Sequence, residues 1–198
     1  MSAGKTIDFW FEFASTYSYL TAMRIEEKAA EASVKVRWKV FNLGPIFGAQ
    51  GWTSSPFNLY PAKGAYMWRD MERMCSARDL ELVKPDPFPQ NSLNAARLAL
   101  AAEDEPWLID FCKGVYLAEF TQGKQINEPE TLGAILQGLG VEPEPWLELI
   151  TQDHIKQALK TRVAEAVEHG IFGAPSFISG DELFWGDDRL EQALEFAK

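Results

Sequence analysis

Residues 6–20 read Thr-Ile-Asp-Phe-Trp-Phe-Glu-Phe-Ala-Ser-Thr-Tyr-Ser-Tyr-Leu, and this stretch decides the fold. From Thr6 to Phe13 an apolar residue occupies every second position, and a period of two residues predicts a strand. Ser15 or Thr16 then stands where a helix N-cap is expected. The apolar spacing that follows predicts a helix to about Ala32.

A second strand follows this helix directly. From Val34 to Phe41 apolar and polar residues again alternate, which predicts a strand. Two strands joined by one helix form a β-α-β unit, in which the strands are parallel and the crossover is right-handed. Residues 1–43 therefore predict the start of an α/β domain.

The middle of the chain predicts helices and no strand. Residues 44–61 are rich in Gly, Pro, Ser and aromatic residues, which predicts a long loop or short helices. Long loops in compact domains are often functional, so we treat 44–61 as a candidate substrate loop. Pro, Gly or Asn bounds each of the helices expected next, which cover 62–78, 91–103, 106–121, 129–139 and 144–152.

The last part of the chain returns to the α/β pattern. A helix over 153–169 precedes a short strand within Gly173–Gly180, and a turn leads to a second strand over Glu182–Trp185. A last helix covers Arg189–Ala197. The order β-α-β, helices, α-β-β-α is the thioredoxin arrangement with a large all-helical insertion. We therefore expect an α/β domain made of 1–43 and 153–198, and a helical insertion subdomain over 44–152.

Composition argues against several classes of function. The 198 residues are 46% hydrophobic, enough for the core of one domain. The formal net charge of −10 has no basic cluster beside it, so no nucleic-acid partner is expected. No run of 18 apolar residues predicts a membrane span, and no signal-peptide core precedes the first strand. A cytoplasmic location is the expectation.

The cysteines and histidines predict neither a redox pair nor a metal site. Cys75 and Cys112 form no CxxC motif and are most simply reduced thiols in helices. His154 and His169 are the only histidines, and no cluster has metal-ligand spacing. A serine hydrolase is not favoured, because the chain lacks a G-x-S-x-G elbow.

Three short motifs could carry chemistry, and each also has a purely structural interpretation. Ser15 stands between a strand and a helix, where a hydroxyl and the helix dipole favour an anion such as a thiolate. Serine is also a common N-cap. Pro175 could be an ordinary strand start or a cis-proline beside that helix. Asp187 and Asp188 could cap the last helix or hold a ligand ammonium group.

Together the motifs resemble a known family. The segments Ser15–Leu20, Phe172–Pro175 and Trp185–Arg189 are similar, in order and spacing, to those of the 2-hydroxychromene-2-carboxylate isomerases. These enzymes belong with the kappa-class glutathione transferases, in the DsbA-like branch of the thioredoxin superfamily. The resemblance covers nearly the whole chain, including the helical insertion, and implies the same thioredoxin-like fold.

The resemblance implies a glutathione site. Ser15 would be the catalytic residue, whose hydroxyl bonds the glutathione sulfur and stabilises its thiolate. Pro175 would be the cis-proline, and the backbone of Ala174 would pair with the cysteinyl part of glutathione. Asp187 and Asp188 would hold the γ-glutamyl end. The complete set of implied glutathione contacts is Ser15, Lys63, Ala174, Pro175, Trp185, Gly186, Asp187 and Asp188. For Lys63 a solvated surface lysine is the structural alternative.

The substrate half departs from the family pattern. The usual Ser-Pro-Tyr-Ser reads Ser-Thr-Tyr-Ser over 15–18, which loses the rigidity of proline but keeps the hydroxyl. The isomerases carry cations for the substrate carboxylate in the loop, where this chain has Phe47 and Leu59, and Trp52 replaces a frequent Asn. The implied substrate pocket consists of Phe47, Trp52, Asn58 and Phe88. Phe9, Trp10, Phe57 and Tyr60 could extend its apolar wall, although a single aromatic residue is usually part of a core.

The resemblance implies a glutathione-dependent isomerase of aromatic (naphthalene) degradation that interconverts 2-hydroxychromene-2-carboxylate and trans-o-hydroxybenzylidenepyruvate. The alternative is a kappa-type glutathione transferase or peroxidase acting on another electrophile, which the missing loop cations favour. A disulfide oxidoreductase is disfavoured because residues 15–18 contain no thiol. A non-catalytic glutathione or peptide binder is the last class considered. A homodimer is implied by the resemblance alone.

Overall fold

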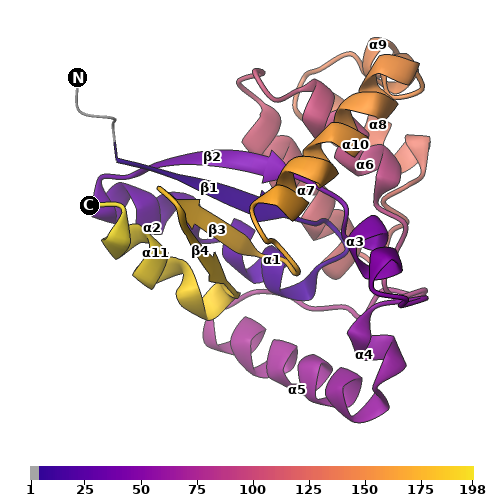
Figure 1. Ribbon diagram of the computed structural model, residues 1–198. Coiled ribbons are helices and arrows are strands. Elements are labelled where there is room, and N and C mark those ends of the chain that lie inside the picture. The colour runs from indigo at the N-terminus through magenta and orange to yellow at the C-terminus, as the bar shows by residue number, and fades with distance from the viewer. Residues whose placement is uncertain (1–4) are drawn as a thin grey trace.

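A four-stranded mixed sheet lies at the centre of the computed structural model, which describes residues 5–198 (Figure 1). The strands are β1 (Thr6–Phe11), β2 (Lys35–Val40), β3 (Ser176–Ser179) and β4 (Glu182–Trp185), and their order across the sheet is β2-β1-β3-β4. β1 and β2 are parallel, whereas β3 pairs antiparallel with both β1 and β4. The predicted parallel pair and the late hairpin are confirmed.

Helices pack on both faces of the sheet and extend beyond one side of it (Figure 1). They are α1 (Thr16–Ala22), α2 (Ile25–Ala32), α3 (Leu43–Ala49), α4 (Pro56–Leu59), α5 (Pro61–Ala77), α6 (Leu93–Ala101), α7 (Leu108–Phe120), α8 (Pro129–Gly138), α9 (Pro143–Leu149), α10 (Asp153–Glu168), the 3-10 helix η1 (Asp187–Arg189) and α11 (Leu190–Phe196). The predicted thioredoxin-like order with a helical insertion is therefore confirmed. Within residues 5–198, none of the helices has the length and apolar character needed to cross a bilayer.

Two predicted boundaries are wrong. The single helix expected from Thr16 to Ala32 is two helices, because the chain leaves the helical conformation at Arg24, where φ is −130°. At this break the guanidinium of Arg24 bonds to Asp187, far along the chain. β1 ends at Phe11 and not at Phe13, because the backbone beyond it turns toward α1.

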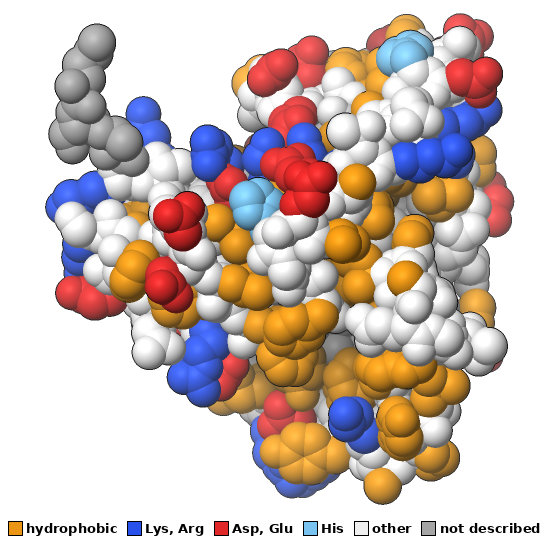
Figure 2. All heavy atoms as spheres, viewed as in Figure 1, with side chains coloured by type: hydrophobic (Ala, Val, Ile, Leu, Met, Phe, Trp, Pro, Cys, Tyr) orange, Lys and Arg blue, Asp and Glu red, His pale blue; other side chains and the backbone are white. Residues whose placement is uncertain are grey.

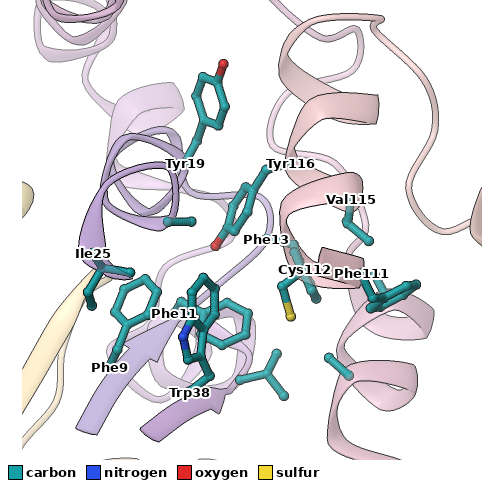
Figure 3. Close-up of a cluster of buried hydrophobic side chains, with 14 of the residues drawn as sticks. Phe9, Phe11, Phe13, Tyr19, Ile25, Trp38, Phe111, Cys112, Val115 and Tyr116 are labelled. Carbon is teal, nitrogen blue, oxygen red and sulfur yellow. The ribbon is translucent and has the colours of Figure 1, made fainter. Parts of the chain in front are cut away.

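The central strand β1 is buried on both faces, so the alternation of apolar and polar residues in β1 does not mark a solvent-facing side. Phe9 and Phe11 pack with Trp38 of β2 against side chains of α7, including Phe111 and Tyr116 (Figure 3). On the other face a second cluster contains Trp10, Phe41, Leu43, Ile46, Ala166, Ile171 and Ile178, which come from the sheet, α3, α10 and the loops beside them. Phe9 and Trp10 are fully buried, and the idea that they line a ligand wall is wrong.

Both cysteines lie in the interior as free thiols. Cys75 is in α5 and Cys112 is in α7, as the sequence predicts. Burial raises the pKa of both thiols, which disfavours the reactive thiolate. Neither side chain is therefore placed to act as a nucleophile.

A buried carboxyl joins the end of β1 to the helices around it. The carboxylate oxygens of Glu12 accept hydrogen bonds from the backbone N–H of Leu43 at 2.9 Å and from the hydroxyl of Ser92. The backbone carbonyl of Glu12 accepts from the hydroxyl of Tyr116 and from the N–H of Ser15, each at 3.1 Å. Burial raises the pKa of the Glu12 carboxyl, although these donors oppose the shift. The turn that carries Ser15 is thus held from α3, α6 and α7.

A second buried carboxyl, that of Glu119 in α7, has no such donors. The side chain is fully buried, and neither carboxylate oxygen has a hydrogen-bond partner in the described part of the chain. Burial, and then the nearby Glu12, raise the pKa of Glu119 well above its usual range. The folded chain therefore binds this proton more tightly than the unfolded chain does.

We expect Glu119→Met to be more stable than the parent protein, increasingly so as pH rises above about 4.3, the ordinary pKa of glutamate. Above that value the unfolded chain loses a proton that the folded chain retains, so the carboxyl destabilises the fold as pH rises. Removing it also removes a buried polar group without partners, worth about 1–3 kcal/mol. Urea denaturation at two pH values, 5 and 8, measures the difference.

Glu119→Gln is the matched control, because it keeps the shape of the side chain and cannot ionise. It should lose the same part of the pH dependence without gaining the full stability of the methionine variant. A stability difference between Glu119→Met and the parent that is equal at both pH values would contradict the assignment.

Candidate functional site

Ser15 is the N-cap of α1 and also contacts the distant end of the chain. Its Oγ accepts a hydrogen bond from the N–H of Ser18 at 3.2 Å and donates one to the carbonyl of Ala174 at 3.0 Å. The neighbouring Thr16 hydroxyl donates to the sulfur of Met67 in α5 at 3.3 Å. The capping interpretation of Ser15 is therefore confirmed. Since capping uses only a lone pair, the hydroxyl proton can still be donated to a ligand in place of Ala174.

The segment before β3 runs beside Ser15. The Ala174–Pro175 peptide bond is cis, so the second interpretation of Pro175 is confirmed. Pro175 is buried, and its carbonyl accepts a hydrogen bond from the N–H of Gly186 at 2.9 Å. The fold thus brings the Ser15 motif into contact with the segment before Pro175, and a backbone hydrogen bond joins Pro175 to Gly186 of the third motif.

Trp185 and Phe172 form an exposed apolar ledge next to this segment. Their ring centroids lie 4.9 Å apart, and each side chain is about half exposed. A Cβ atom at Gly173 would lie 2.5 Å from Nε1 of Trp185, so glycine lets the indole lie directly on the backbone. Figure 2 shows that hydrophobic side chains gather over the lower middle of one face of the molecule. Surface of this kind favours contact with an apolar ligand.

Asp187 is a buried carboxylate whose oxygens are bonded within the chain. They accept hydrogen bonds from the hydroxyl of Thr21 at 2.9 Å, from Arg24 at 3.1 Å and from Arg78 at 2.6 Å. Arg24 also forms an ion pair with Glu191 of α11. These bonds hold α1, the end of α5 and η1 together. The direct role in glutathione binding predicted for Asp187 stays a prediction, and this geometry directs its oxygens inward.

Asp188 differs from its neighbour because it faces solvent. Its side chain is 71% exposed and forms an ion pair with Arg189 at 3.0 Å. The hydroxyl of Tyr17 in α1 donates to Asp70 at 3.0 Å, and burial is the main cause of the raised pKa of Tyr17. Asp188 belongs to η1, which packs against α1, the helix that Ser15 caps.

Lys63 is an exposed residue of the first turn of α5. Its Nζ lies 5.6 Å from the centroid of the Tyr60 ring. No ion pair involves Lys63 within residues 5–198. The lysine therefore remains available to a ligand carboxylate, and its predicted role stays a prediction.

The predicted substrate residues fall into two pairs. The rings of Phe47 and Trp52 pack together with centroids 5.4 Å apart. The amide nitrogen of Asn58 donates to the carbonyl of Phe88 at 2.9 Å. Asn58 and Phe88 also line a pocket of about 480 Å³ with four residues that the sequence analysis did not select, namely Trp68, Lys84, Pro85 and Asp86. No motif marks these four, because only the fold brings α5 and the segment after it together.

Comparison with known proteins extends this picture to the whole chain. The model of the DSBA-like thioredoxin domain family matches residues 6–197. A 2-hydroxychromene-2-carboxylate isomerase of Sphingobium xenophagum is 24% identical, over 94% of this chain and 95% of its own length. Glutathione S-transferase kappa 1 of Caenorhabditis elegans is 24% identical, over 93% of this chain and 87% of its own.

A solved structure of 2-hydroxychromene-2-carboxylate isomerase superposes with a TM-score of 0.84 at 24% identity, and the match covers 94% of this chain and 91% of that one. At this identity the superposition shows the fold, while the family match spans nearly every residue. The chain belongs to the DSBA-like thioredoxin domain family.

Proposed function

We propose that this chain binds glutathione and, with Ser15, uses it to interconvert 2-hydroxychromene-2-carboxylate and trans-o-hydroxybenzylidenepyruvate. The observation that carries the proposal is the Ser15 hydroxyl, 3.0 Å from the carbonyl of Ala174 beside a cis-proline. The similarity to curated isomerases over nearly the whole chain supports it.

The residues around Ser15 fit glutathione. The Ser15 hydroxyl can turn its proton from Ala174 to a sulfur atom while its lone pair still caps α1. Once released, the Ala174 carbonyl can accept an N–H of the ligand backbone, as an edge strand does. The exposed carboxylate of Asp188 can pair with the ligand ammonium group, and Lys63 with a ligand carboxylate.

The chain contributes a hydrogen-bond donor, a fixed position and an apolar surface to the reaction. When bound, glutathione would supply a thiolate that adds reversibly to a conjugated carbon, so that a former double bond can rotate. A hydrogen bond from Ser15 to the charged sulfur is worth about 1.5–3 kcal/mol and lowers the thiol pKa. The exposed rings of Phe172 and Trp185 lie beside Gly173 and would offer an apolar surface to a ligand bound next to Ala174.

A kappa-type glutathione transferase or peroxidase is the second candidate. Residues 44–60 contain no Lys or Arg, so this segment offers no cation to a substrate carboxylate. Similarity to kappa glutathione transferases also extends over most of the chain. Both candidates use Ser15 in the same way. Side-by-side assays of chromene isomerisation and electrophile conjugation distinguish them.

We expect Ser15→Ala to raise the pKa of bound glutathione by about one unit toward the ordinary thiol value of about 8.5. Turnover should fall about tenfold to a hundredfold, because a hydrogen bond to the charged sulfur is lost. Titrating glutathione against pH while following thiolate absorbance measures the shift. Unchanged turnover in this variant would refute the role of Ser15.

Ser15→Gly separates chemistry from capping, because glycine at an N-cap costs only a few tenths of a kcal/mol relative to serine. It should lose thiolate stabilisation as Ser15→Ala does, while its unfolding free energy stays close to that of the parent. If only the less stable alanine variant lost activity, the effect would belong to the cap.

The two neighbouring aspartates should respond differently to substitution by asparagine. Asp188→Asn should raise the KM for glutathione about fivefold, because one exposed charge pair with the ligand is lost, and should leave the free energy of unfolding unchanged. Asp187→Asn leaves Arg78 without its counter-charge and should lower the unfolding free energy by about 3 kcal/mol. Urea denaturation and initial rates on both variants check this. Equal effects of the two substitutions on KM and on stability would contradict the assignment.

A further inference from the structure

The pocket of about 480 Å³ lies between α5 and the segment 78–92 that follows it. Its volume is in the range of small-molecule sites. The rings of Trp68 and Phe88 form two of its walls, with centroids 4.8 Å apart and planes at 70°. Asn58 fixes the position of Phe88 by its hydrogen bond to the Phe88 carbonyl. The two rings pack edge to face and form one continuous aromatic surface, on which a flat aromatic guest can stack.

Lys84 is the only cation among the described residues that line this pocket. Its Nζ lies 5.4 Å from the centroid of the Trp68 ring, and within residues 5–198 it forms no ion pair. Attraction to the face of an indole positions an ammonium group without neutralising it. Within the described part of the chain, Lys84 therefore presents an ammonium group without a bonded counter-ion beside the Trp68 ring.

We infer that this pocket holds the ring of a planar aromatic monocarboxylate and that Lys84 is the residue that selects the carboxylate. Asp86 lines the same pocket. A second negative charge on the ligand would meet this carboxylate, so the pocket favours one anionic group over two. Lys84 thus supplies the cation that residues 44–60 lack.

This inference rests on the proposed function, since it assigns the substrate half of the same site. Asn58, which lines the pocket, is next in the chain to Phe57. The ring centroid of Phe57 lies 6.4 Å from that of Tyr17. Tyr17 belongs to α1, the helix that Ser15 caps. The pocket is therefore joined to the surroundings of Ser15 through α4 and α1.

Binding without glutathione tests the pocket separately from activity. Calorimetric titration with 2-naphthoate, and with its neutral analogue 2-naphthamide, uses the full chain as it stands. Lys84→Met should weaken naphthoate binding about fivefold to tenfold and leave naphthamide binding unchanged. Asp86→Asn should tighten naphthoate binding about twofold, because a like charge is removed. Lys124→Met, at an exposed lysine outside the pocket, is the control and should change neither.

Equal affinity for the acid and the amide, or unchanged naphthoate binding by Lys84→Met, would overturn the inference. With an active isomerase, Lys84→Met should raise the KM for the chromene carboxylate and leave kcat nearly unchanged. If Lys84→Met had the same isomerase kinetics as the parent protein, the proposed function would stand and the role of Lys84 in the pocket would be rejected. If naphthoate bound in a Lys84-dependent way but the protein had no isomerase activity, the pocket assignment would stand and the proposed function would be rejected.

Discussion

The candidate site depends on the buried carboxyl of Glu12, which joins the sheet to the helices. Its oxygens accept from Leu43 at the start of α3 and from Ser92 just before α6, while its backbone carbonyl accepts from Tyr116 of α7. A buried carboxyl without such donors is costly, so these segments must assemble together. The helical insertion therefore helps to fix the turn that carries Ser15, and the thioredoxin-like part does not position this residue alone.

A fixed turn has a chemical consequence at Ser15. The Ser15 hydroxyl has a single proton, which it donates in a hydrogen bond to the Ala174 carbonyl in this structure. Donation to a ligand then exchanges one acceptor for another, without moving the backbone or uncapping α1. The buried ion pairs of Asp187 with Arg24 and Arg78 hold the third motif close to the same helix. Preorganisation of this kind lowers the entropy that ligand binding must otherwise overcome.

The sequence pattern predicted those parts of the fold that depend on residues close together in the chain. The alternation of apolar and polar residues predicted β1 and β2, and the positions of Pro and Gly predicted the order of the helices. Both signals depend only on residues within a few positions of one another in the chain. The break at Arg24 and the burial of Trp10 could not be read in this way. Both residues have partners far along the chain: Arg24 bonds to Asp187, and Trp10 packs with residues of α3 and α10. The inward direction of Asp187 was missed for the same reason.

The surroundings of Ser15 and the pocket around Lys84 are built from different parts of the fold. The Ser15 half lies where the sheet meets α1 and is tied to the core through Glu12, so changes there disturb packing as well as chemistry. The pocket around Lys84 is formed by α4, α5 and the segment after α5, none of which belongs to the sheet. In a chain with a net charge of −10, an anionic ligand would need a local cation. That cation could come from any segment facing the pocket, so short motifs constrain the surroundings of Ser15 more tightly than they constrain the pocket around Lys84.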